Sequence, residues 1–289
     1  MKKLSQKEKE TLLRFIERNV KNGPDPENLD EGIGTVYERV VVDEYFREMV
    51  PKYQIKTVLE TPADGVTGVP GINSLEFARN GAFVVLTNPS ALMLQNAKRV
   101  WQREGLLKKV EFIQCEVDEL PFKDREFDLV WNYCMFERFQ DPEIILSEMK
   151  RVSKKYLYLL TQNAHNLGTP LHYLYHKTNQ LEWDHGDKRL MRLKTIIKIL
   201  NKNQLEILEA GAIDTPPWLD TWDMPLRGEL KKILTALGLK WEWQTKEKQS
   251  RDSRFLRFFV WIEKNLPRFF LFSQTHHFHL LTQKTKEVA

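Results

Sequence analysis

The chain alternates between short apolar runs and segments whose apolar residues recur at helical spacing. Strands are expected at 56–60, 83–86, 110–117, 127–133 and 156–161, all but 110–117 containing a continuous apolar run, and helical patterns separate most of them. Strands that read as continuous apolar runs are typical of parallel sheets buried on both faces. The alternation therefore predicts parallel βαβ units with helices on both faces of one sheet.

The rest of the chain carries further predicted elements. Within the alternating region, helices are expected at 73–80, 90–104 and 142–152. Before it, the spacing predicts helices at 5–20 and 35–50, with Pro51 ending the second. After it, we expect a helix at 191–201, a strand at 205–213, helices near 226–237 and 251–264, and a last strand at 277–282.

These elements predict four units along the chain. Residues 1–51 form an N-terminal helical cap, and 52–161 form the core. Residues 162–204 are a histidine-rich insertion, and 205–289 complete the sheet around an aromatic and basic insertion. Both insertions follow strands, so we expect them over the carboxyl edge of the sheet, where open α/β sheets bind ligands.

Composition and charge narrow the class of protein. The chain has 289 residues, of which 42% are hydrophobic and 29% charged, and its net charge is +4. This ordinary globular mix excludes a disordered or fibrous chain. The positive excess is small and lies in 240–289 together with many aromatic residues, so a nucleic-acid partner is not expected.

Cysteine usage and the N-terminus bear on the compartment. Cys115 and Cys134 form neither a disulfide framework nor a CxxC metal pair. No apolar run follows the first lysines, and no stretch approaches the roughly 20 apolar residues of a membrane span. We therefore expect a reduced, cytoplasmic compartment.

The first predicted strand ends in a feature typical of cofactor binding. Glu60 closes the strand and is followed by Gly65, Gly68 and Gly71. Glycines allow a backbone to approach a ligand closely. Glycine-rich turns are common, however, and Glu60 alone would also suit a solvated acid at a strand end.

A more specific run follows the third strand. It reads Glu116-Val117-Asp118-Glu119-Leu120-Pro121-Phe122, then Phe127-Asp128-Leu129-Val130, Asp141-Pro142 and Arg151-Val152. In order and spacing, this run resembles class I S-adenosylmethionine-dependent methyltransferases of the small-molecule type. The resemblance extends from about Tyr37 to Thr161.

The resemblance implies a fold, a cofactor and a set of binding residues. The fold would be a Rossmann-like, seven-stranded, mostly parallel α/β sheet with helices on both faces, a helical and aromatic cap, and an antiparallel last strand. The cofactor would be S-adenosyl-L-methionine. The implied cofactor-binding residues are Tyr37, Glu60, Asp64, Gly65, Gly68, Asn88, Glu116, Val117 and Asn132.

Three residues depart from the family pattern. Pro62 and Asp64 stand near the expected first glycines of the loop. Asn88 stands where the family has an acid that holds the ribose hydroxyls, and an Asn-Pro turn explains it equally well. Loss of one charge-assisted hydrogen bond would cost about 1–2 kcal/mol, or roughly tenfold in affinity.

The acceptor side offers four candidate catalytic residues. Tyr133 and Glu137 lie at and after the end of the fourth strand, and His165 and His185 lie in the first insertion. Histidine titrates near neutral pH and suits a general base, although each of these side chains could be packed or exposed without a function. A general base is required only if the acceptor carries a proton of high pKa.

No metal is predicted. His172 and His176 are spaced for one helical face, but the chain has no HExxH motif. Histidines in a cap are often plain polar contacts, so we expect neither residue to bind a metal.

The expected function is methyl transfer to a small, partly hydrophobic acceptor. The methylated atom and the oligomeric state are not readable from the sequence. Alternatives are a catalytically inactive binding or scaffold subunit, motivated by the departures in the loop, and a membrane-associated lipid methyltransferase. The last is suggested by the arginine- and phenylalanine-rich stretch 255–272, which would equally suit a helix packed on the sheet.

Overall fold

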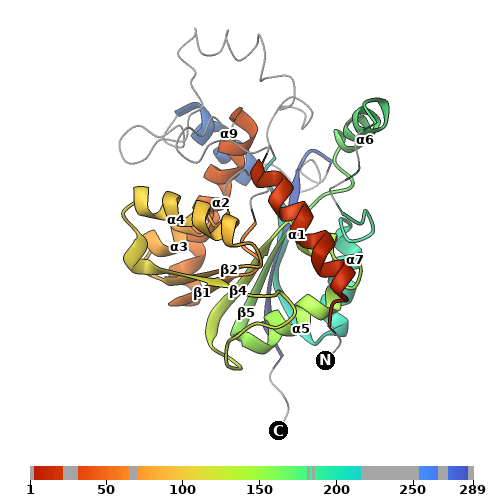
Figure 1. Ribbon diagram of the computed structural model, residues 1–289. Coiled ribbons are helices and arrows are strands. Elements are labelled where there is room, and N and C mark those ends of the chain that lie inside the picture. The colour runs from red at the N-terminus through yellow and green to blue at the C-terminus, as the bar shows by residue number, and fades with distance from the viewer. Residues whose placement is uncertain are drawn as a thin grey trace.

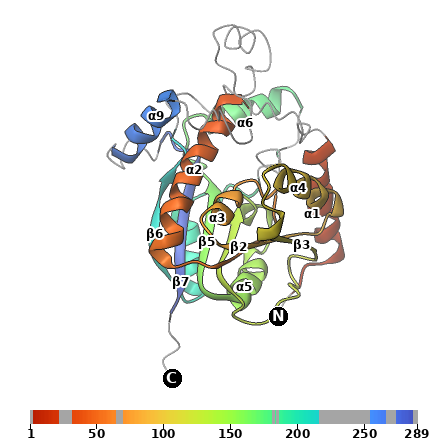
Figure 2. The ribbon, with the colours of Figure 1, turned by 90° about the vertical axis from the view of Figure 1, so that its left-hand side faces the viewer.

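The protein is described by a computed structural model, which covers 3–21, 32–64, 70–180, 183, 186–215, 254–265 and 273–285. Its centre is one seven-stranded sheet with the strand order β3-β2-β1-β4-β5-β7-β6 (Figures 1 and 2). Strands β1 to β5 are parallel, and β7 runs antiparallel to both β5 and β6, as expected. The strands are β1 Thr57–Glu60, β2 Phe83–Asn88, β3 Val110–Gln114, β4 Phe127–Tyr133, β5 Ser153–Gln162, β6 Leu205–Ile213 and β7 His277–Lys284.

Helices cover both faces of this sheet. Helices α2 and α3 share one hydrophobic core with the sheet, and α1, α5 and α7 share the other. None of the described helices is long and apolar enough to cross a membrane. The helices are α1 Gln6–Lys21, α2 Gly32–Tyr53, α3 Leu75–Arg79, α4 Ala91–Arg103, α5 Pro142–Val152, α6 Thr169–Thr178, α7 Leu193–Lys202 and α9 Arg254–Asn265, with short 3-10 turns η1 Leu107–Lys109 and η2 Phe136–Arg138.

The continuous apolar runs arise because the central strands are buried on both faces. Along β5, Tyr158 and Leu160 pack into the core beneath α2, while Leu157 and Leu159 pack into the core beneath α5. Side chains alternate between the faces of a strand, so both sets must be apolar. Burial of both faces of the strand therefore explains the continuous apolar pattern in the sequence.

Several predicted boundaries differ from the structure by a few residues. Pro51 does not end its helix, because it lies in the last turn of α2, which continues to Tyr53. Gln54, with a φ of 54°, turns the chain instead. Strand β3 ends at Gln114, earlier than predicted, and β5 begins at Ser153, directly after α5.

Polar caps explain why two helices begin where they do. Ser90 accepts a hydrogen bond from the Met93 amide at 3.5 Å and caps α4. Asp141 accepts from the Glu143 amide at 3.3 Å, and the following Pro142 occupies the first turn of α5. Both arrangements satisfy amides that have no partner within the helix. The Asp-Pro pair recognised in the sequence is thus a helix start.

The carboxyl ends of the parallel strands face the parts of the chain expected to form a cap. Figures 1 and 2 show α6 and α9 beyond this edge, while the chain leaves β7 at the opposite end. The predicted helix near 226–237 lies outside the described residues. The boundaries of the four predicted units stay a prediction.

Candidate active site

A buried acid ends the first strand. Glu60 is 2% exposed, and Ser74 donates a 2.6 Å hydrogen bond from its hydroxyl to Oε2 of Glu60. Trp131 in turn donates from its indole nitrogen to the Ser74 hydroxyl at 3.0 Å. Burial, with the nearby charge of Asp64, raises the pKa of Glu60 to about 8 despite the Ser74 hydrogen bond. Glu60 is therefore a held, desolvated carboxyl group and not a solvated strand-end acid.

The loop after Glu60 is fastened from both sides. Asn88 at the end of β2 donates from its amide to the Ala63 carbonyl at 2.7 Å, and Asn132 on β4 donates to the Thr61 carbonyl at 2.8 Å. Each asparagine also accepts, through its side-chain oxygen, from a backbone amide a few residues further along the chain. The two amides thus fix the backbone that leads out of β1.

These contacts bear on the predicted ligands around the loop. Asn88 and Asn132 are both buried and hold the loop, so a contact of either with a ribose stays a prediction. Asp64, the other predicted acid of the loop, is 2% exposed. Gly65 and Gly68 lie outside the described residues.

Glu60 at the end of β1 and Asp64 in the loop place two buried carboxyl groups at a point where ligands commonly bind. Strand β1 lies between β2 and β4, so the order of the sheet reverses beside it. Ligands of open α/β sheets bind outside the carboxyl ends of strands at such a point. The negative charge of Asp64 disfavours ionisation of Glu60 at this position. A cationic ligand would offset this effect, and both the ammonium and the sulfonium of S-adenosylmethionine are cations.

The acids after β3 contact the N-terminal segment. Asp118 is 5% exposed and accepts from the Leu4 amide at 2.7 Å, while Lys9 lies 3.0 Å from its other oxygen. Glu116 is exposed and lies 3.7 Å from Lys9, whereas Val117 is buried. Asp118 therefore holds α1 against the edge where the predicted adenine contacts of Glu116 and Val117 lie.

The Leu-Pro-Phe segment is held by the end of α5. Arg151 donates to the carbonyls of Leu120 at 2.8 Å and Phe122 at 2.7 Å. Glu148 accepts from the Leu120 amide at 2.9 Å and pairs with Arg151 at 2.8 Å. Two distant parts of the recognised motif are therefore one structural unit that fixes the loop after β3.

A second polar cluster lies on the acceptor side of the sheet. Tyr133, at the end of β4, donates a hydrogen bond from its hydroxyl to Oε1 of Glu38 on α2. Both side chains are buried, and the Tyr133 ring lies 5.9 Å from the His277 ring. Burial raises the pKa of Glu38 to about 7, although the charge of His277 opposes the shift.

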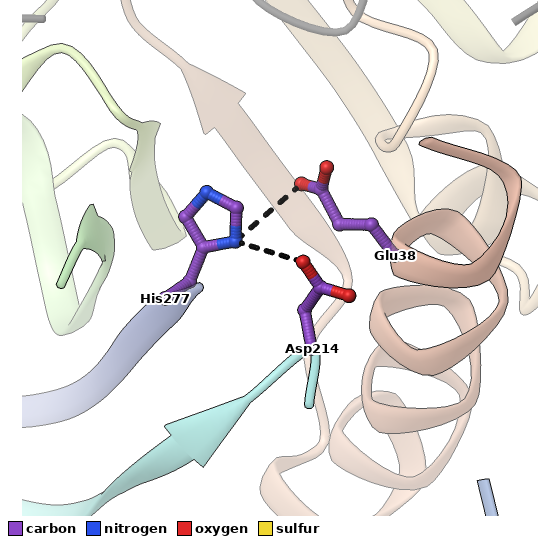
Figure 3. A group of neighbouring side chains, drawn as sticks. All are labelled: Glu38, Asp214 and His277. Carbon is purple, nitrogen blue, oxygen red and sulfur yellow. Dashed lines mark ion pairs between the residues drawn. The ribbon is translucent and has the colours of Figure 1, made fainter. Parts of the chain in front are cut away.

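Two histidines and an aspartate complete this cluster. Nδ1 of His277 lies 3.4 Å from Oδ2 of Asp214 and 3.9 Å from Oε1 of Glu38 (Figure 3). Nδ1 of His276 lies 2.8 Å from the same Asp214 oxygen. Burial works to raise the pKa of Asp214, but the two histidines outweigh it and hold that pKa below its ordinary value.

Tyr37 belongs to the wall of this cluster. Its hydroxyl donates to Oε2 of Glu263 on α9 at 2.6 Å. Glu263 also accepts from the amides of Asp214 at 2.9 Å and Thr215 at 2.8 Å, and burial raises its pKa to about 7. The Tyr37 hydroxyl thus helps α9 to hold the end of β6, and a cofactor contact of Tyr37 stays a prediction.

The predicted bases lie in different environments. Glu137 is fully buried, accepts from the Gln162 amide at 3.1 Å, and has a pKa raised by burial. His165 is exposed on a turn after β5. His185 lies outside the described residues. Of the predicted bases, Glu137 therefore combines burial with a position directly after β4.

The two histidines of α6 pack in an aromatic cluster. Their ring centroids lie 4.9 Å apart, and the His176 ring lies 5.6 Å from the Trp183 ring. Among the described residues, the one group whose ligand atoms lie close enough to share a metal ion consists of Glu38, Asp214 and His277.

Sequence reasoning named Tyr133 but missed the other members of this acceptor-side cluster. Of these, Glu38 comes from α2, Asp214 is the residue after β6, and His277 is the first residue of β7. The predicted antiparallel last strand could have indicated His277. The first residue of an antiparallel strand lies at the edge where the parallel strands end. His277 pairs with Ile213 and Gln162 at that edge.

Comparison with known proteins identifies the central part of the chain. Residues 66–160 match a family model described as a methyltransferase domain. A ubiquinone/menaquinone biosynthesis C-methyltransferase, UbiE, of Xanthomonas oryzae pv. oryzae is 31% identical over 109 residues, which are 36% of this chain and 43% of that protein. An uncharacterized methyltransferase of Schizosaccharomyces pombe is 33% identical over 86 residues, 28% of this chain and 31% of that protein. The match thus spans less than half the length of these relatives.

Solved structures show the same fold at low sequence identity. The [4+2]-cyclase SpnF has a TM-score of 0.53 at 16% identity, covering 84% of this chain and 80% of its own. Geranyl diphosphate methyltransferase in complex with S-adenosylmethionine has a TM-score of 0.51 at 12% identity, covering 85% of each chain. Together with the strand order, these similarities show that the chain has the fold of class I S-adenosylmethionine-dependent methyltransferases, and residues 66–160 match a methyltransferase domain.

Proposed function

We propose that this protein binds S-adenosylmethionine outside the carboxyl end of β1 and transfers its methyl group to a small, partly hydrophobic acceptor. The observation that carries the proposal is the buried pair Glu60 and Asp64, fixed in a loop at the point where the strand order reverses. A cationic ligand offsets the cost of burying these two acids, and a neutral ligand does not.

The other proposed cofactor contacts come from residues at or near the carboxyl edge of the sheet. We propose that Glu60 and the loop with Asp64, Gly65 and Gly68 hold the amino acid end. Asn88 would bind the ribose with its remaining amide capacity. We further propose adenine contacts for Glu116 and Val117, and contacts near the reacting methyl group for Asn132 and Tyr37.

The chain's own residues have three tasks in the proposed reaction. When bound, the cofactor would supply a methyl group already activated by its sulfonium, and this methyl group would pass to the acceptor while the electron pair of the S–CH₃ bond stays on sulfur. The chain must align the two reactants and exclude water. It must also accept a proton if the acceptor carries one. Tyr133 ends β4 and Glu137 lies in the turn η2 that follows, and Glu137 is the better base because burial raises its pKa.

The curated relatives favour carbon as the methylated atom. UbiE carries the name of a C-methyltransferase of quinone biosynthesis. We propose by analogy that the acceptor here is an electron-rich ring, whose carbon attacks the methyl group and then loses its proton. A buried base beside the ring fits this reaction, because the ring proton must be transferred to a protein group when water is excluded from the site.

A membrane-facing acceptor is a second candidate. On α9, Phe258 is 54% exposed and Trp261 is 61% exposed, and on α6 Leu171 and Leu174 are about as exposed. Co-sedimentation with anionic vesicles tests this candidate. Loss of sedimentation in a Phe258→Ser, Trp261→Ser variant would support it, and wild-type protein that stays in the supernatant would exclude it.

Methyl transfer itself can be tested without a known acceptor. The full chain is incubated with S-adenosylmethionine and a panel of quinols, phenols and amines, and products are detected as S-adenosylhomocysteine and as acceptors one methylene heavier. We expect turnover with at least one ring acceptor. Glu137→Gln should keep cofactor affinity and lose most turnover. Cofactor binding without turnover on any acceptor would instead favour a binding or scaffold subunit, and SpnF shows that this fold also occurs in a protein named as a cyclase.

A further inference from the structure

Three buried ligand groups on the acceptor side converge within the reach of one ion. Glu38 projects from α2, Asp214 follows β6, and His277 opens β7, so three separate elements aim these side chains at one point (Figure 3). All ligand atoms of the group lie within 4.8 Å of one another, and all three residues are buried. The tertiary fold therefore brings these side chains together, and their proximity does not result from closeness in the sequence.

From this convergence we infer a divalent metal site formed by Oε1 of Glu38, Oδ2 of Asp214 and Nδ1 of His277. The site is independent of the proposed methyl transfer, because it uses none of the residues assigned to the cofactor. An imidazole with two carboxylates suits a first-row transition ion such as Zn²⁺, Mn²⁺ or Fe²⁺ better than Mg²⁺ or Ca²⁺, which prefer oxygen ligands alone.

The distances suit a shared ion. Ligand atoms bound about 2.0–2.2 Å from one ion lie roughly 3–3.5 Å apart in tetrahedral or octahedral positions. Nδ1 of His277 already lies 3.4 Å from the Asp214 oxygen and 3.9 Å from the Glu38 oxygen. The Glu38 oxygen lies within 4.8 Å of the other two ligand atoms, and it would have to move closer to both when an ion binds.

The groups behind the ligands are also those of a metal site. His276 contacts the Asp214 carboxylate at 2.8 Å, and the Tyr133 hydroxyl donates to Glu38. Each carboxylate oxygen can accept such a hydrogen bond and still bind a cation through its second lone pair. Outer partners of this kind fix the orientation of metal-binding carboxylates.

A second observation concerns the Asp214 carboxylate itself. Oδ1 of Asp214 is buried and makes no hydrogen bond with any residue in the described part of the chain, although the side chain is 1% exposed. Buried carboxylate oxygens are normally satisfied, and a bidentate contact with an ion would satisfy this one. An ion would also balance the two carboxylates that surround a single ligating imidazole.

Metal titration tests whether the protein binds a transition ion and whether the three proposed ligands are needed for that binding. Metal-free full chain, prepared with a chelator, is titrated with Zn²⁺ against a chromophoric competitor and with Co²⁺ by visible absorption. We expect one ion per chain. Glu38→Gln, Asp214→Asn and His277→Gln should each weaken binding by more than the roughly 10–100-fold caused by losing an outer hydrogen bond, and Tyr133→Phe should weaken it by about tenfold.

Matched controls separate this site from others. Glu137→Gln replaces another buried acid, and the double variant His172→Gln, His176→Gln removes the paired histidines of α6; both should bind Zn²⁺ like the wild type. X-ray absorption of the Zn²⁺-loaded wild-type chain should show one imidazole among oxygen ligands. That measurement needs no variant to fold.

Several results would overturn the inference. They are no binding of Zn²⁺ or Co²⁺, binding that the Asp214→Asn and His277→Gln variants retain, binding lost only in the α6 double variant, and sulfur or several imidazoles in the absorption spectrum. The absence of binding would show instead that the cluster is a self-contained ion pair between acids and histidines.

Discussion

Ser74 donates its hydroxyl to Glu60 at 2.6 Å, beneath the loop that we propose binds the cofactor. The hydrogen bond favours the charged carboxylate, yet burial and Asp64 outweigh it and leave the pKa of Glu60 near 8. Glu60 is therefore largely protonated at neutral pH until a cation binds beside it. This relationship makes both stability and cofactor affinity depend on pH.

Replacing Glu60 with Gln should remove one component of the pH dependence of stability. Because the folded pKa of about 8 exceeds the ordinary value of 4.5, the folded state binds more protons than the unfolded state between these values. The stabilisation is complete below about pH 4.5 and is lost as the pH rises through about 8. Urea unfolding across this range should show the wild type losing stability relative to Glu60→Gln, by on the order of a few kcal/mol.

Cofactor affinity should show the opposite dependence. A cation binds the charged form of Glu60, so the wild-type affinity for S-adenosylmethionine should rise relative to that of Glu60→Gln as the pH approaches 8. The ratio of the two affinities cancels the titration of the ligand's own amino group. Calorimetry at several pH values gives this ratio. A ratio that stays constant would show that Glu60 does not contact the cationic part of the ligand.

Arg151→Ala should loosen the loop after β3. The guanidinium donates to two loop carbonyls and pairs with Glu148, and its side chain is 22% exposed, so we expect a loss of about 2 kcal/mol or more. Arg151→Lys keeps the charge, but a lysine ammonium lacks the planar set of donors with which the guanidinium reaches both carbonyls and Glu148. It should therefore restore only part of the stability. Denaturant unfolding measures the change, and full rescue by lysine would contradict this role.

Gly186→Ala should disturb the segment that carries Glu137. Gly186 has a φ of 95°, and an added Cβ would lie 2.8 Å from the carbonyl carbon of Glu137 and closer still to its oxygen. Gly81 has a φ of 97° with nothing within 4 Å, so Gly81→Ala introduces the same backbone strain without the clash. Urea unfolding should show the greater loss for Gly186→Ala, beyond the about 1–2 kcal/mol of strain that both share. Equal losses would show that the clash relaxes freely.

Phe46→Ala should destabilise the core beneath α2. Phe46 is fully buried, with its ring 4.1 Å from the Phe77 ring and 5.1 Å from the Trp131 ring. Removing it leaves a cavity, and such changes cost about 3–5 kcal/mol. Phe46→Leu keeps most of the volume and should cost clearly less. Thermal or urea unfolding compares them, and a similar loss for both would show that the aromatic contacts, not volume, stabilise this core.

The sequence predicted the fold well because its strongest patterns are local. Strands 127–133 and 205–213 and helix 142–152 have the predicted bounds, since apolar periodicity and the Asp141-Pro142 cap determine them within a few residues. Pro51 was misjudged because a proline in a last turn removes a single hydrogen bond, which does not end the helix.

The site was less predictable because it depends on contacts between distant residues. The acidic end of β1 was recognisable, but the sequence does not show that Asn88 and Asn132 hold the loop from opposite sides. Glu38, Asp214 and His277 lie more than 60 residues apart along the chain, so no spacing rule brings them together. Asp214 and His277 meet because of the register of β6 and β7, whereas Glu38 is brought to them by helix α2.

Calorimetric titration of the full chain with S-adenosylmethionine tests the central claim most directly, with Glu60→Gln as the matched variant. The account predicts one ligand bound per chain, and an affinity that falls when the buried carboxyl at the end of β1 is replaced by an amide. Absence of binding by the wild-type chain to either S-adenosylmethionine or S-adenosylhomocysteine would contradict it.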